Sequence, residues 1–177
     1  MLNQDMLSRF SFFSHVAQDK LEEIAQWGDI LEFKPDEVIF HQDEEAENLY
    51  GLLDGEVELI IVFEEKKLKT NIKYEKSVQT REKTVERPIV FRTISPGEVF
   101  AWSSLVEPRI LTATARCTKK SRIFSLPAAR LVAMFEKDTA LGYLFMTRLT
   151  EIISQRLKTR TRMLIEAWGE AFEIDRM

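Results

Sequence analysis

The chain has 177 residues, of which 45% are hydrophobic and 31% are charged, enough for one globular domain and an additional element. The net charge of −4 argues against nucleic acid as the default partner, and the single cysteine, Cys117, excludes an internal disulfide. No apolar run approaches the ~20 residues of a membrane-spanning helix, and the residues after Met1 do not resemble a signal peptide. We therefore expect a cytoplasmic protein without a membrane segment.

The first 63 residues predict a helix followed by closely spaced strands. The apolar stripe of the helix is formed by Val16, Leu21, Ile24 and Ala25, and Gly28 can end it. From Asp29 onward the hydrophobic period changes to that of strands. Four apolar runs, separated by turn residues, occupy residues 30–33, 38–40, 49–53 and 57–63. Short strands with turns between them favour a sandwich, a roll or a barrel.

Residues 64–92 form a charged segment with the period of a half-exposed strand. Leu68, Thr70, Ile72 and Tyr74 alternate there with the polar residues Lys67, Lys69, Asn71 and Lys73. We expect the segment to extend a hairpin outward, with a mobile tip near residues 77–83. Two interpretations stay open: a solvated loop, which is the more common fate of charge-rich stretches, and a docking surface for a partner protein. The first is favoured.

Residues 95–116 combine the elements of an anion-binding site. Ser95-Pro96-Gly97 is typical of a turn, and a short extended run begins at Glu98. The small residues and hydroxyls at 101–105 favour a tight turn or the first turn of a helix. From Ile110 to Ala115 the β-branched character predicts a second strand. A short helix between two strands, with its free N–H groups outward, can hold an anion.

This stretch resembles the phosphate-binding cassette of the cyclic-nucleotide-binding domain, as found in the catabolite activator and FNR family of bacterial regulators. The cassette usually reads Phe-Gly-Glu-x-x-Leu, followed a few residues later by Arg-x-Ala-Thr. The framework positions match at Phe100, Leu105, Ala113 and Thr114. In the family the Glu holds the ribose 2′-hydroxyl and the Arg holds the cyclic phosphate. Trp102 and Leu111 stand at these two positions and Ala101 replaces the Gly, so the resemblance implies an altered pocket.

The resemblance extends from about Phe13 to Pro127. Residues in register with the family's first half are Phe33, Pro35, Ile39, Gln42, Ala46, Leu49, Tyr50, Gly55 and Val57. Asp36 and Asp43 replace two turn glycines, and because Asp tolerates a left-handed backbone we expect these turns to persist. The implied fold is α+β: a jelly-roll-like antiparallel β-roll of the cyclic-nucleotide-binding type, flanked by an N-terminal helix and C-terminal helices.

The C-terminal part predicts a last strand, a short helix and a long helix. Ile123 to Leu126 forms the strand, Pro127 suits the first position of the short helix, and Asp138 is a candidate N-cap for the long one. The apolar stripe of the long helix comprises Leu141, Phe145, Leu149, Ile152, Ile153 and Leu157. About thirty residues of helix span roughly 45 Å, which is more than one small domain can cover, so the stripe needs a partner.

In the resembled family this helix forms a parallel dimer interface and reaches over the ligand pocket. We therefore divide the chain into a β-roll domain at residues 1–137 and a dimerisation helix with a tail at residues 138–177. The helix carries Arg156, Lys158, Arg160 and Arg162, which helical geometry splits over more than one face. After Trp168-Gly169 there is no room for the helix-turn-helix domain of family transcription factors, so we expect no direct DNA binding.

The candidate ligand-binding residues are Phe100, Ala101, Trp102, Ser103, Ser104, Arg109, Leu111, Thr112, Arg160 and Thr161. Trp102 either stacks on a planar ligand or plugs the emptied pocket. Arg109 is the best candidate for a substitute anion partner, although an exposed loop position explains it equally well. The family register places Arg160 and Thr161 near the base of the nucleotide. The hydroxyls of the set also suit a helix cap or a strand face.

No catalytic or metal-binding pattern is present. His15 and His41 are solitary, and Cys117 has no His nearby in sequence. We expect a non-enzymatic, homodimeric sensor without a cofactor, which binds a small molecule other than cyclic AMP and signals through the C-terminal helix to a partner protein. The alternative is an interaction scaffold that binds no ligand because Trp102 plugs the pocket.

Overall fold

The computed structural model describes the backbone of residues 1–72 and 78–174 and the side chains of residues 1–62 and 87–169. In chain order the elements are α1 (Gln4–Leu7), the 3-10 helix η1 (Ser11–Phe13), α2 (Gln18–Ala25), β1 (Asp29–Phe33), β2 (Val38–Phe40), β3 (Asn48–Asp54), β4 (Val57–Ile72), β5 (Val78–Ile94), β6 (Val99–Phe100), the 3-10 helix η2 (Trp102–Leu105), β7 (Thr114–Cys117), β8 (Ser121–Pro127), α3 (Ala128–Lys137) and α4 (Thr139–Ile174).

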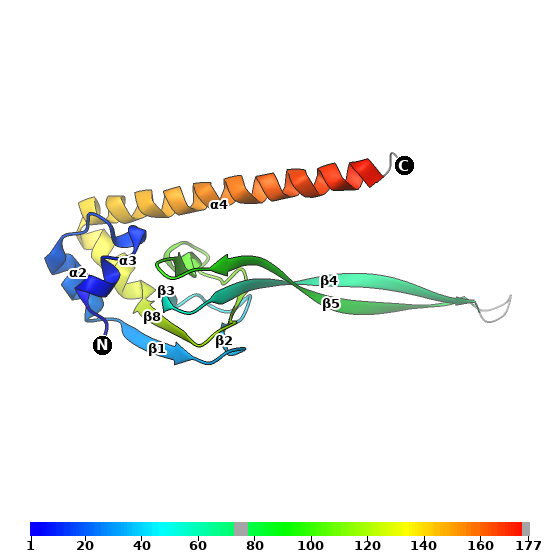
Figure 1. Cartoon of the computed structure of the whole chain (residues 1–177), viewed down its shortest axis with the longest axis horizontal. Helices are drawn as coiled ribbons and strands as arrows, with labels where there is room; N and C mark the ends of the chain where they lie inside the picture. The colour runs from blue at the N-terminus through cyan, green and yellow to red at the C-terminus, as the bar shows by residue number, and fades with distance from the viewer. Residues whose placement is uncertain (73–77, 175–177) are drawn as a thin grey trace.

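The strands form the predicted antiparallel β-roll (Figure 1). One four-stranded sheet has the order β1-β8-β3-β6, and the other has the order β2-β7-β4-β5. The turns before and after β2 require left-handed residues, and Asp36 and Asp43 supply them, each with φ of 67°. Their N–H groups donate to Cys117 O and Leu111 O, both at 2.8 Å, so each turn is tied to the second half of the roll. The prediction that these turns persist with Asp is confirmed.

Two apolar clusters divide the interior. The first joins the N-terminal helices, α3 and the start of α4 to the sheet that contains β8, through edge-to-face contacts among Phe10, Phe13, Phe124 and Phe145. The second lies between the two sheets and includes Phe40, Leu52, Leu59, Phe100 and Ile123. The candidate site is built on the second cluster.

The long helix α4 begins at its predicted cap and leaves the body of the protein. Leu141 N–H donates to Asp138 Oδ1 at 3.0 Å, which confirms the N-cap. Pro127 ends β8 and caps α3 instead of opening that helix, a difference of one position. Of the apolar stripe on α4, Leu141, Phe145 and Leu149 are buried against the first cluster and Ile152 packs on its edge. Most of the stripe is thus covered by its own domain.

Strands β4 and β5 form a long hairpin, paired from Val57 and Ile94 to Ile72 and Val78. The hairpin and α4 project from the body in the same direction (Figure 1). Residues 78–83, which the sequence analysis assigns to the tip of the hairpin, instead belong to β5. Residues 73–77 lie outside the described part. None of the helices in the described part of the chain combines the length and hydropathy needed to cross a lipid bilayer.

Candidate ligand-binding site

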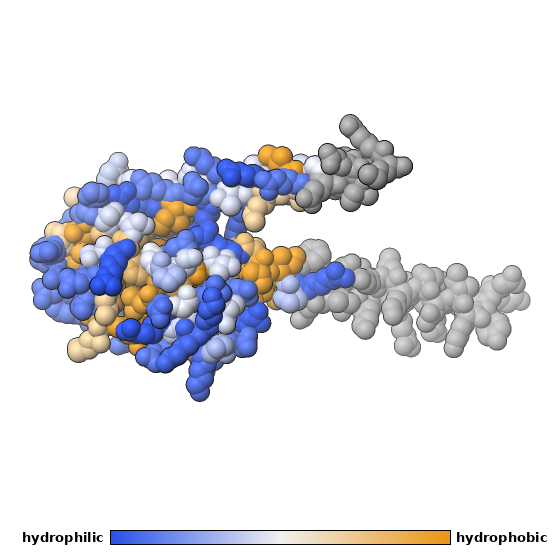
Figure 2. Space-filling model, viewed as in Figure 1, coloured by the Kyte–Doolittle hydropathy of each residue, from blue (hydrophilic) through white to orange (hydrophobic). Residues whose placement is uncertain are grey.

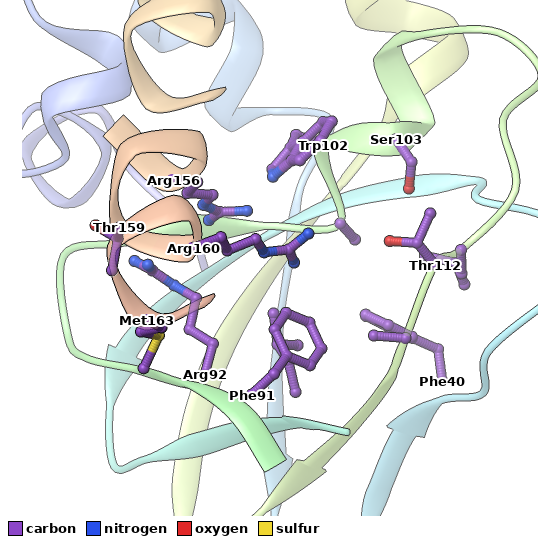
Figure 3. A pocket seen from close by; sticks show the side chains of 14 residues that line it. Phe40, Phe91, Arg92, Trp102, Ser103, Thr112, Arg156, Thr159, Arg160 and Met163 are labelled. Carbon is purple, nitrogen blue, oxygen red and sulfur yellow. The ribbon is translucent and has the colours of Figure 1, made fainter. Parts of the chain in front are cut away.

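A cavity of about 240 Å³ lies between one end of the β-roll and α4 (Figure 3). Its volume is just below the range of about 300–1,000 Å³ that is usual for small-molecule sites. The floor is apolar and is formed by Phe40, Leu59, Leu111 and Ala113, all of them buried. These residues come from β2, β4 and the segment before β7, so the floor is the part of the second apolar cluster that borders the cavity.

The turn into η2 supplies one wall. Ala101 adopts a left-handed conformation with φ of 57°, and Trp102 and Ser103 follow it as the first residues of η2. Trp102 is half-buried in the wall and leaves the cavity beside it open. Thr112 lies on the same side of the site as Ser103 and directs its hydroxyl into the cavity (Figure 3). The predicted strand at Ile110 to Ala115 is shorter than expected: Ile110 forms an isolated bridge with Glu45, and β7 begins at Thr114.

A β-bulge in β5 supplies a second wall. Leu59 pairs with Arg92 and Ile60 pairs with Val90, which leaves Phe91 as an extra residue. In a regular strand, neighbouring side chains point to opposite faces of the sheet. Here the consecutive side chains of Phe91 and Arg92 both reach the cavity. The bulge therefore brings a cation and an aromatic ring into the same site.

The helix α4 closes the cavity with four side chains on one face: Arg156, Thr159, Arg160 and Met163. The Arg156 guanidinium lies 5.5 Å from the centroid of the Trp102 ring, and the Arg160 guanidinium lies 4.7 Å from that of Phe91. Both are cation–π contacts. Arg156 Nη2 also donates to Val99 O at 3.2 Å, which ties α4 to the roll.

The site is strongly cationic. Arg92 Nη2 donates to Glu98 Oε1 at 2.5 Å, but none of the residues lining the cavity is acidic. Burial, then the neighbouring Arg92 and Arg160, lowers the pKa of Arg156 to about 10, and Glu98 acts in the opposite direction. Arg156 is therefore charged at neutral pH. Within the described residues, the buried Nε atoms of Arg92 and Arg156 have no hydrogen-bond partner.

Six of the ten candidate residues lie together around the cavity: Ala101, Trp102, Ser103, Leu111, Thr112 and Arg160. The other four lie elsewhere. Phe100 is buried behind the cavity and stacks on Tyr50 with the ring centroids 5.6 Å apart. Thr161 is exposed and its hydroxyl donates to Leu157 O at 2.9 Å.

The remaining two candidates, Ser104 and Arg109, line a separate hollow near the start of α3. Ser104 is fully buried, and Arg109 Nε pairs with Glu107 Oε1 at 3.1 Å. The structure thus places Arg109 away from the cavity, because the chain from Pro108 to Ile110 follows the opposite side of η2.

Sequence reasoning missed the two arginines that accompany Arg160. Arg156 precedes Arg160 by four residues, and side chains at that spacing share a helix face, so this signal was available. Thr159 and Met163 follow from the same spacing. For Arg92 the sequence carries no comparable signal, because only the bulge at Phe91 turns it towards the cavity.

Nucleophilic or metal chemistry has no support in the described part of the chain. Cys117 is fully buried, and burial raises the pKa of its thiol, which keeps it protonated and unreactive at neutral pH. Among the residues whose side chains are described, no three His, Cys, Asp or Glu residues come together as a metal site.

Comparison with known proteins agrees with the geometry. The profile of the family described as cyclic nucleotide-binding domain matches residues 30–138. No curated protein sequence matches the chain. A crystal structure of a protein from Geobacter metallireducens GS-15, assigned by name to the cyclic nucleotide-binding proteins, is 30% identical with a TM-score of 0.65, and the match covers 89% of this chain and 99% of that one.

Two further solved structures have the same fold. The sensor domain of the regulator DNR from Pseudomonas aeruginosa is 18% identical with a TM-score of 0.59, over 88% of this chain and 91% of that one. The Catabolite Activator Protein of Thermus thermophilus is 18% identical with a TM-score of 0.58, over 86% of this chain and 61% of that one. At this identity the similarity concerns the fold alone.

Proposed function

This chain belongs to the cyclic nucleotide-binding domain family, and we propose that it is a non-enzymatic, homodimeric sensor whose ligand is a small molecule other than cyclic AMP. The observation that carries the proposal is that the β-roll forms one side of the cavity and α4 forms the other. A ligand that fills this space contacts both parts at once. Its binding would change the position of α4 relative to the roll and so signal to a separate partner protein.

The same cavity argues against tight binding of cyclic AMP. The family pattern places a Glu and an Arg on the ribose and the cyclic phosphate, and Trp102 and Leu111 occupy these positions here. Hydrogen bonds to charged groups contribute about 1.5–3 kcal/mol each, so the loss of two or three weakens binding by roughly two to five orders of magnitude. Leu111 is buried, and it offers an anion no compensation for the water it sheds.

The homodimer is supported by the face of α4 that lies outside both the core and the cavity. Large apolar side chains are exposed there at steps of seven and four residues: Met146, Ile153, Leu157 and Leu164. Figure 2 shows apolar surface on the part of α4 that extends beyond the roll. This spacing is the repeat of a coiled coil, in which two parallel copies of one helix bring identical residues together. A second copy of the chain is therefore the proposed cover for this stripe.

The lack of clustered nucleophiles and metal ligands in the described residues supports a non-enzymatic role. Cys117, which is free and buried, supports the cytoplasm as the proposed location, where thiols stay reduced. Trp102 leaves the cavity open, and this favours the sensor over the scaffold with a plugged pocket.

Native mass spectrometry of the purified protein tests the proposal. We expect a mass above that of the polypeptide, and a small molecule released on denaturation. The variant Thr112→Trp fills the cavity from an exposed position and should carry no such molecule. The variant Thr147→Trp, which places the same side chain on the exposed surface of α4, should retain it. A wild-type protein that is empty and binds no added metabolite would support the scaffold instead.

A further inference from the structure

The cationic groups of the cavity come from α4 and β5. Arg156 and Arg160 extend from α4 and Arg92 extends from β5; the guanidinium groups of Arg92 and Arg156 lie beside α4, and that of Arg160 reaches into the middle of the cavity over Phe91 (Figure 3). The hydroxyls of Ser103 and Thr112 lie on the opposite side. The apolar floor connects the two ends.

We propose that this cavity selects a small dianion, a phosphate monoester or a pair of neighbouring carboxylates on a flat apolar body, and holds its charge on α4 and β5 rather than on the η2 cassette. The inference rests on the proposed function, that the cavity binds a ligand. It adds the chemical class of that ligand and the direction in which it lies.

An anion binds where protein donors replace the water that it sheds. This decides at which end of the cavity the charge of the ligand lies. At the cassette, Leu111 presents buried apolar surface, so a charge placed there loses hydration without compensation. At the other end, guanidinium groups offer planar pairs of N–H donors that match phosphate and carboxylate oxygens. The buried Nε atoms of Arg92 and Arg156 have no partner within the described residues. An anion at this end would supply them with acceptors.

The preference for a ligand with two negative charges follows from the number of arginines and carboxylates at the cavity. Three arginines line the cavity, and Glu98, which contacts Arg92, is the carboxylate whose charge acts on Arg156. Two cations are left without a carboxylate among the described side chains. A monoanion would neutralise one of them, whereas a dianion would neutralise both.

The flat apolar body follows from the two aromatic walls. Trp102 and Phe91 each hold a guanidinium over a ring face, so the arginines are oriented before a ligand arrives. Between these walls the floor of Phe40 and Leu111 accepts apolar surface. Ser103 and Thr112 can hydrogen-bond a polar substituent at the far end.

Isothermal titration calorimetry with matched probes tests the inference. At pH 8 phenyl phosphate is a dianion, because the second pKa of a phosphate monoester is about 6, whereas methyl phenyl phosphate is a monoanion of nearly the same shape. We expect phenyl phosphate to bind at least about tenfold more tightly than methyl phenyl phosphate. Phthalate, which carries two carboxylates, distinguishes a carboxylate site from a phosphate site.

The variants separate the cavity arginines from general charge effects. Arg160 is exposed, so Arg160→Gln should fold normally, and it should lose about tenfold or more in phenyl phosphate affinity and most of the preference. Arg156→Gln should have a similar effect. Arg162→Gln removes the same charge from an exposed position two residues away, outside the cavity, and should leave both affinities unchanged.

Three results would overturn the inference: equal affinity for the two phosphates, no binding of any probe at millimolar concentration, or equal losses in Arg160→Gln and Arg162→Gln. The failure of the sensor proposal is a different result. If the purified protein retains a molecule with one charge or none, the sensor proposal stands and the dianion inference fails. If Thr112→Trp retains the same molecule as the wild type, the ligand lies outside this cavity and the sensor proposal fails.

Discussion

Ala101 shows how a single backbone angle positions the wall of the cavity. Its φ of 57° lies in the left-handed region, which costs an L-residue roughly 1–2 kcal/mol. The resembled cassette has Gly at this position, where the same conformation carries little penalty. The N–H of Ser104 donates to Ala101 O at 3.0 Å, so the turn persists despite the side chain. The strain is thus located where Trp102 enters the site.

We predict that Ala101→Gly stabilises the protein by about 1 kcal/mol, because it removes a left-handed Cβ. In a chain of this size the melting temperature should rise by about 2–4 °C. The control is Ala115→Gly in β7, where the strand is buried and extended, and it should lower stability by roughly 0.5–1 kcal/mol or more. Thermal denaturation followed by circular dichroism measures both. A lower melting temperature for Ala101→Gly would show that the turn is not strained.

At the scale of elements, α4 carries three functions on different faces. Its first turns complete the core through Phe145, which is 0% exposed. A second face closes the cavity with Arg156 and Arg160. A third face exposes Leu157 (65%) and Leu164 (51%), and these have no cover within the described residues of one chain. Substitutions at Phe145 or Ile152 would therefore disturb the domain itself and report little about dimerisation.

We predict that Leu157→Asp converts the dimer to a monomer that is still folded. Burial of an apolar side chain contributes about 1.5–3 kcal/mol, and the symmetric interface loses this contribution from both copies. Gln155→Asp adds the same charge to an exposed position off the stripe and should remain dimeric. Light scattering after size exclusion at micromolar concentration measures the mass. A wild-type monomer, or a dimeric Leu157→Asp variant, would contradict the proposed interface.

At the scale of the whole molecule, the sequence predicted features that depend on local chemistry. The turns at Asp36 and Asp43, the strands of the first half and the cap at Asp138 follow from turn propensity, hydrophobic period and capping. The roll itself came from matched positions of a known pattern. These features depend on neighbours in sequence, or on a resemblance spread over most of the chain.

The charge of the site could not be predicted in the same way. Arg92 lies in a charged strand that is typical of solvated surface, and its direction depends on the pairing of Leu59 and Ile60 across the hairpin. Arg109 appeared better placed, because it is close in sequence to the lost family Arg, but its chain segment follows the far side of η2. Long-range register and chain direction decide which cation faces the cavity.

The proposed sensor depends on a ligand in the cavity that joins α4 to the β-roll. Hydrogen exchange followed by mass spectrometry tests it directly, by comparing the protein as purified with the same protein unfolded, freed of its retained molecule and refolded. We predict that amides of residues 152–168 exchange several-fold more slowly in the loaded protein, while amides of the buried strand β8 exchange equally in both. Equal exchange over residues 152–168 in the two forms would contradict the claim, because α4 would then be indifferent to the occupied cavity.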